Sequence, residues 1–67
     1  MDLAIGAYGA MRQRVDDGCE WLDMRSISFS EDHAFKLAML GNEEGGKSWT
    51  NANPVKRIAR LTIAEMD

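Results

Sequence analysis

Residues 41–48 carry the spacing of a phosphate-binding loop. Gly41 and Gly46 are followed by Lys47 and Ser48, which satisfies the pattern G-x-x-x-x-G-K-[ST]. Such a loop binds nucleotide phosphates through backbone N–H groups and the lysine, provided that it follows a buried strand and opens a helix. The chemistry that this spacing suggests is nucleotide binding or hydrolysis.

The residues on both sides of this segment argue against that chemistry. Residues 33–40 suit a helix rather than a strand, and Pro54 with the short polar residues before it opposes a helix after the loop. Glu43 and Glu44 would also place two carboxylates among the amides that hold phosphate, where like charges repel. We therefore interpret residues 41–48 as a connector and predict no enzyme activity and no cofactor. Nucleotide binding is the least favoured alternative.

Other residues that could do chemistry form no recognisable set. His33 is the single histidine, and Glu31 and Asp32 lie within one helical turn of it, where three ligands cannot converge on a metal. Cys19 and His33 could act as nucleophile and base, but no third orienting group is identifiable. We predict no catalytic residue and no metal site.

Trp49 is the residue of the predicted connector that best suits partner binding. Tryptophan is enriched in the energetic centres of protein interfaces, and Trp49 stands in a polar, glycine-rich segment close to Lys47. Its ring either covers the edge of the core or forms an exposed anchor, and the sequence leaves both open.

Acidic and basic residues separate along the chain. Residues 16–44 hold eight acids and two bases, whereas residues 47–60 hold four bases and no acid. The favoured interpretation is that the two segments lie close together and neutralise each other, with about 0 to 1 kcal/mol for each exposed pair. The alternative is a binding surface that carries both negative and positive charge. Its predicted contact residues are Glu43, Glu44, Lys47, Trp49, Asp16, Asp17, Arg57 and Arg60.

Composition bounds the class of protein. A chain of 67 residues, 45% hydrophobic and 28% charged, has room for one domain with one core, residues 1–67. Its net charge of −3 disfavours general nucleic-acid binding, although the basic segment keeps that class open. We expect no membrane span and no export signal. The single cysteine, Cys19, excludes an internal disulfide and favours the cytoplasm.

The first half of the chain favours a β-hairpin. Apolar residues at odd positions from Leu3 to Val15 indicate a strand with Arg12 and Arg14 on its other face, although helical spacing also fits. Residues 16–18 predict a turn with a left-handed glycine, in a register that puts Arg14 opposite Glu20. The apolar residues then change parity, which predicts a bulge or break at residues 25–26.

The second half favours a helix and a strand. Ser28 or Ser30 would cap a helix that ends at Gly41, and residues 42–54 are predicted to form a long loop. Residues 55–66 suit a strand, with Arg57 on one face and Lys56 and Arg60 on the other. A helix over the same residues, started by Asn53 and Pro54, is the less favoured alternative.

The predicted fold class is therefore α+β. A small antiparallel sheet, made of the hairpin and the C-terminal strand, would carry one helix packed on one face. Open edges in so small a sheet would also allow a homodimer.

Two parts of the chain resemble the strand, short helix and strand of small phage proteins, among them anti-CRISPR inhibitors. The matching residues are 27–31, Ala34, 36–38 and 57–63. The resemblance implies a phage-encoded, non-enzymatic inhibitor that occupies a surface of a bacterial protein or ribonucleoprotein defence complex in the host cytoplasm. Carboxylates between Asp16 and Glu44 would present phosphate-like charge to a basic partner. The alternative function is a nucleic-acid-binding or regulatory protein that uses the basic residues 47–60.

Overall fold

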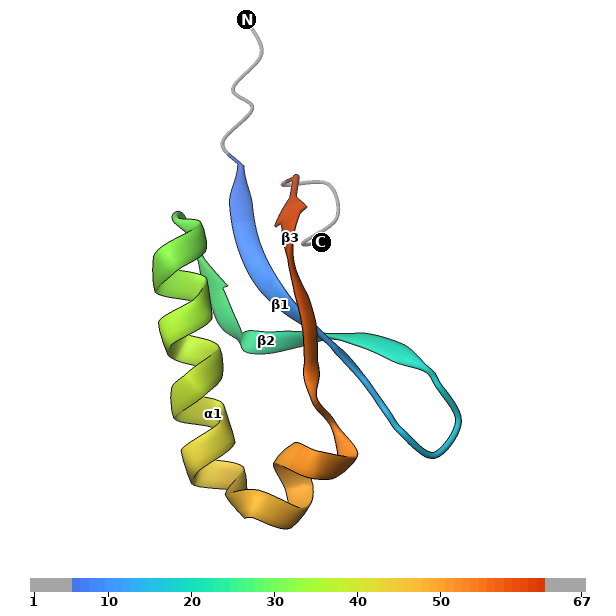
Figure 1. Cartoon of the computed structure of the whole chain (residues 1–67). Helices are drawn as coiled ribbons and strands as arrows, with labels where there is room; N and C mark the ends of the chain where they lie inside the picture. The colour runs from blue at the N-terminus through green and yellow to red at the C-terminus, as the bar shows by residue number, and fades with distance from the viewer. Residues whose placement is uncertain (1–5, 63–67) are drawn as a thin grey trace, which may run out of the picture.

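The structure is a computed structural model, and it describes residues 6–62. Its elements are β1 (Ala7–Gln13), β2 (Glu20–Ser28), α1 (Glu31–Ala52) and β3 (Val55–Leu61). The strands form one antiparallel sheet in the order β2-β1-β3, so the first strand is the central one (Figure 1). The predicted α+β fold with its C-terminal strand is confirmed. Positions 3, 5 and 63–66 of the predicted strands lie outside the described residues, and no helix within 6–62 is long and apolar enough to cross a membrane.

β1 and β2 form the predicted hairpin, with a left-handed glycine in its turn. Gly18 has a φ of 72°, and its N–H donates to the carbonyl of Arg14 at 2.8 Å. The predicted pairing of Arg14 with Glu20 is wrong by one position, because Gln13 lies opposite Glu20 and the N–H of Arg14 donates to the carbonyl of Cys19. Arg14 instead pairs with Asp17 inside the turn, at 2.6 Å.

β2 contains the predicted bulge. Its residues Asp23 and Ser28 pair with Ala10 and Tyr8 of β1, so residues 24–27 lie opposite a single residue. The N–H of Ala10 donates there to Ser26 Oγ at 2.7 Å, and this hydroxyl donates to the carbonyl of Asp23 at 2.6 Å. The fully buried Ser26 side chain thus satisfies the main chain that the bulge interrupts.

α1 is longer than predicted. Ser30 is its N-cap, since Ser30 Oγ accepts the N–H of His33 at 3.0 Å, which confirms the second of the two proposed caps. The helix does not end at Gly41 but continues to Ala52, so the predicted loop over residues 42–54 is wrong. It bends at Gly46, whose φ of 86° and ψ of 170° are not helical. Trp49 in this segment contacts Arg12 of β1 and Trp21 of β2, and such tertiary contacts override the weak helix propensity of the segment.

Small residues bring α1 close to the sheet. Ala34, Ala38 and Gly41 are buried and recur at helical spacing, and Ala10 in the central strand is fully buried as well. The helix packs mainly on β2 and β1 and least on β3 (Figure 1). This close approach forms the core, and it leaves β3 the least covered strand.

Candidate binding surface

Arg12 occupies the space between the sheet and α1. The sequence places it on the solvent side, and that prediction is wrong, because its side chain is 0% exposed. Its Nε donates to Asp23 Oδ2 at 2.9 Å, and its Nη2 donates to the carbonyl of Ala38 at 3.1 Å. Its Nη1 donates to Asn42 Oδ1 at 2.8 Å and to the carbonyl of Asn53 at 2.9 Å. These bonds fix the helix and its last turn relative to the hairpin.

Trp49 covers this network. The guanidinium carbon of Arg12 lies 4.6 Å from the centroid of the Trp49 ring, a cation–π contact. The ring of Trp21 meets Trp49 edge-on, with centroids 6.2 Å apart and planes at 71°. Trp49 is half-buried, so the structure supports the covering role rather than the exposed anchor.

The other predicted contact residues lie in separate places. Glu44 on α1 pairs with Arg25 of β2 at 3.7 Å, while Glu43 and Lys47 are exposed near the helix bend. Asp16 and Asp17 are exposed in the hairpin turn, and Arg57 and Arg60 are exposed on β3. The eight residues thus come from α1, the hairpin turn and β3, and no ion pair within residues 6–62 joins one of them to another.

Asp17 is held in its charged form by the turn. The N–H of Cys19, which donates to Asp17 Oδ1 at 3.0 Å, is the main reason that the pKa of this carboxyl lies below its usual value, and the guanidinium of Arg14 adds to it. Asp17 in turn raises the pKa of Arg14. This pair stabilises the hairpin turn, and it leaves Asp16 as the carboxylate of the turn without an ion pair within residues 6–62.

β3 concentrates positive charge. Glu20 of β2 contacts two of its cations, Arg57 at 3.2 Å and Lys56 at 3.9 Å. The predicted separation of Lys56 from Arg57 is wrong, because the register shifts where β3 passes Arg12 and adds one residue to β3 there. Arg60 is exposed and has no ion pair in the described part of the chain. Within residues 6–62, Glu20 is therefore the acid of residues 16–44 that pairs with the basic residues 47–60, and it contacts two of the three cations of β3.

Within residues 6–62, the outer edge of β3 also has main-chain groups that pair with no other strand. The N–H of Ala10 points to β2, since it donates to Ser26. In an antiparallel pair, the residue opposite such a position directs its own N–H and C=O outward. Ile58 lies opposite Ala10, so its main-chain groups face away from β1, and those of Arg60 do the same two residues later. The edge of β3 is therefore open to a further strand.

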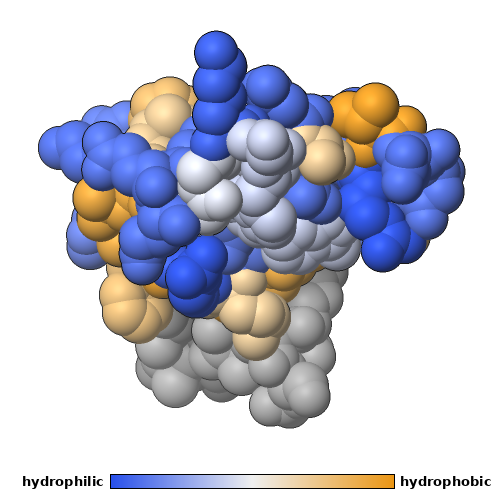
Figure 2. Space-filling model, turned by 90° about the horizontal axis from the view of Figure 1, so that it is seen from below, coloured by the Kyte–Doolittle hydropathy of each residue, from blue (hydrophilic) through white to orange (hydrophobic). Residues whose placement is uncertain are grey.

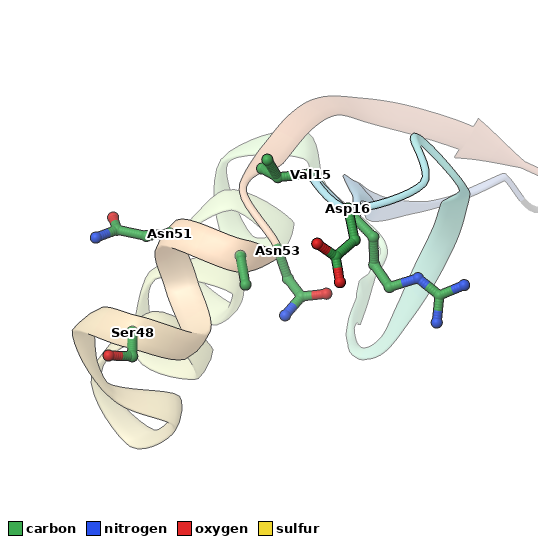
Figure 3. A pocket seen from close by; sticks show the side chains of 7 residues that line it. Val15, Asp16, Ser48, Asn51 and Asn53 are labelled. Carbon is green, nitrogen blue, oxygen red and sulfur yellow. The ribbon is translucent and has the colours of Figure 1, made fainter.

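A pocket of about 410 Å³ lies between the hairpin turn and the end of α1. Figure 3 shows Val15 and Asp16 on the hairpin side and Ser48, Asn51 and Asn53 on the helix side. The N–H of Val15 donates to the carbonyl of Ala52 at 3.0 Å and joins the two sides. No group of three or more His, Cys, Asp or Glu residues within 6–62 is placed to hold a metal ion.

Residues 41–48 lie inside α1 and at its bend. They follow helical residues instead of a strand, and the N–H groups up to Gly45 belong to the helix. This segment therefore does not form the strand-to-helix loop that phosphate binding requires. Figure 2 shows the surface around the bend and the hairpin as mainly hydrophilic, with apolar residues at its margins.

Exposed apolar side chains are spread over several elements. They come from the hairpin turn, β2, the segment between β2 and α1, and α1 itself, and they are Val15, Met24, Phe29, Phe35 and Leu40. We compared the chain with known protein families, with curated proteins and with solved structures, and none of the three comparisons found a match.

Sequence reasoning missed two parts of this arrangement. The first is the hydrogen-bond network of Arg12. Its signal in the sequence was the helical spacing of the small residues Ala34, Ala38 and Gly41, which leave room for the Arg12 side chain between α1 and the sheet. The second is the outward direction of Ile58 and Arg60, which depends on the strand order and has no local signal.

Proposed function

We propose that this protein is a non-enzymatic binding module that occupies a surface of another protein through β3. One observation carries the proposal: the outer edge of β3 combines unused main-chain groups at Ile58 and Arg60 with a surplus of positive charge. Exposed strand edges are a recurrent means of recognition between proteins. The resemblance to anti-CRISPR inhibitors makes inhibition of a bacterial defence complex, by a phage-encoded protein in the host cytoplasm, the proposed context.

Affinity capture from a bacterial lysate, followed by reconstitution with the purified captured protein, tests the proposal. The variant Arg57→Glu/Arg60→Glu reverses two charges on β3, and Lys36→Glu/Lys47→Glu makes the same change on exposed positions of α1. We expect calorimetry to show affinity at least about tenfold weaker for the β3 variant and nearly unchanged for the control. Equal affinity for both variants would contradict the proposal.

Nucleic-acid binding is the second candidate, and the observation that favours it is that β3 has three cations, of which two contact Glu20 and Arg60 has no ion pair within residues 6–62. Titration with single-stranded and duplex DNA at several salt concentrations separates the two functions. Phosphate contacts make affinity fall steeply with salt. Such a dependence, lost in Arg57→Glu/Arg60→Glu, would support this candidate, and the absence of binding at low salt would eliminate it.

A further inference from the structure

The two edges of the sheet differ in how accessible they are. The outer strand β2 is interrupted by its bulge, the N–H of Arg25 donates to Asp23 Oδ1 at 3.1 Å, and α1 packs against this strand most closely. β3 pairs with β1 without a register shift from Arg57 to Leu61 and has the fewest contacts with α1. Because bulges and covering elements protect an edge, β3 is the edge that can accept another strand.

The charges on β3 disfavour a second copy of this chain as that strand. Because outward-facing residues pair with outward-facing residues, a two-fold antiparallel pair must be centred on one residue. A pair centred on Arg60 would put the two copies of Arg60 opposite each other, and a pair centred on Ala59 would put them in diagonally neighbouring positions. A pair centred on Ile58 would put Lys56 opposite Arg60. Like charges directly opposite each other destabilise a sheet, and β3 contains no acidic residue to relieve them.

The same charges fit an acidic segment. We infer that the outer edge of β3 takes up an acidic, extended segment of a partner protein as a fourth strand of the sheet. The main chain of the segment bonds to Ile58 and Arg60, an acidic side chain lies beside Arg60, and an apolar side chain two positions away lies beside the half-buried Ile58. This inference rests on the proposed binding function and specifies the chemistry of the partner.

A peptide main chain suits this edge better than a nucleic acid does. Each outward-facing residue offers a donor and an acceptor together, which is the complement of another strand. The net charge of −3 on the whole chain opposes the approach of a long phosphate polymer, whereas a short segment meets only the local surplus of cations.

The test uses a labelled peptide of about eight residues, with glutamate and valine alternating on one face and threonine on the other. One control peptide has lysine in place of glutamate, and a second keeps the glutamates but has methylated main-chain nitrogens. We expect fluorescence anisotropy to show binding at least about tenfold weaker for each control. In hydrogen exchange by NMR, the amides of Ile58 and Arg60 should exchange quickly in the free protein and at least about tenfold more slowly in the complex, while that of Ala59 changes little.

Variants of the protein test the charge requirement. Arg60→Glu should bind the lysine peptide in preference to the glutamate peptide, whereas Lys47→Glu, which makes the same change near the helix bend, should keep the original preference. Equal binding of the methylated peptide, or unchanged exchange at Ile58 and Arg60, overturns the inference. So does sedimentation of the free protein as a dimer with these two amides protected, or protection of them by an oligonucleotide instead of the peptide.

One outcome separates this inference from the proposed function. A reconstituted partner whose binding depends on the charges of β3, without slower exchange at Ile58 and Arg60, would retain the proposed function and overturn the added strand. A partner that binds independently of β3 would overturn both.

Discussion

Arg12 is buried with four hydrogen bonds to groups on β2, α1 and the segment before β3. In the variant Arg12→Met, the carboxylate of Asp23 stays buried without its cation, a change that costs about 3–5 kcal/mol. A domain of this length has a stability of roughly 3 to 10 kcal/mol. Arg12→Met should therefore lose a large part of its free energy of unfolding, as measured by urea denaturation followed by circular dichroism.

A matched control separates burial from charge. Arg57→Met removes a cation from an exposed ion pair, so its cost should stay within about 1 kcal/mol. The double variant Arg12→Met/Asp23→Leu removes both buried charges and should be more stable than Arg12→Met alone. Similar stability for Arg12→Met and Arg57→Met would show that the buried network does not hold the fold.

Asp17 makes the stability of the hairpin turn depend on pH in the acidic range. Because its pKa is lowered in the folded state, its stabilising contribution is complete above the usual value of 3.8 and is lost as the pH falls through the lower, folded value. The variant Asp17→Asn keeps an acceptor for Cys19 but has no charge to titrate. The amide resonance of Cys19 should shift as the pH falls below about 4 in the wild type and stay constant in the variant. A shift of equal size in both would assign the titration to another group.

Among the elements, the bent helix depends on Gly46. Its φ of 86° and ψ of 170° fall in a region that is essentially restricted to glycine. Gly46→Ala should therefore destabilise the protein by about 1–3 kcal/mol, although alanine favours straight helices. Lys47→Ala, at the next and exposed position, should stay within about 0.5 kcal/mol in the same thermal denaturation. A more stable Gly46→Ala variant would mean that α1 has no need to bend.

Elements with local signals could be predicted from the sequence. The turn at Gly18 follows from the residues before it, the bulge at Ser26 from the change of parity, and the cap at Ser30 from its own side chain. Each of these depends on a few neighbouring residues, which is why the hairpin, the start of α1 and the fold class are correct.

Features that depend on contacts distant in sequence could not be predicted. Gly41 and its neighbours in the sequence predict the end of a helix. A Cβ atom at this position, however, would lie 3.3 Å from Arg12 Nη2 and 3.5 Å from Asp23 Oδ2. The glycine thus allows the helix to pass over a buried ion pair that the sequence does not reveal. The face on which Lys56 lies depends in the same way on a register shift against Arg12.

For the molecule as a whole, buried and exposed charges differ in their response to salt. The pairs Arg14–Asp17 and Arg25–Glu44 are more than half exposed, whereas Arg12–Asp23 is 0% and 5% exposed. Sodium chloride at 1 M shortens the screening length to about 3 Å but acts little on buried pairs. The free energy of unfolding, measured in urea at 0.1 M and at 1 M salt, should differ between the two by no more than about 1–2 kcal/mol. A loss as large as that of Arg12→Met would place the main electrostatic stabilisation on the surface.

The order of the strands has a consequence during translation. β1 leaves the ribosome first and can pair with β2 soon afterwards, but its second neighbour, β3, is synthesised only after the whole of α1. Until then the nascent chain carries an unpaired side on what will be its middle strand, at Ala7, Gly9 and Met11. Growing chains on the same messenger RNA are exposed to one another at that moment, and mispairing between them competes with completion of the sheet.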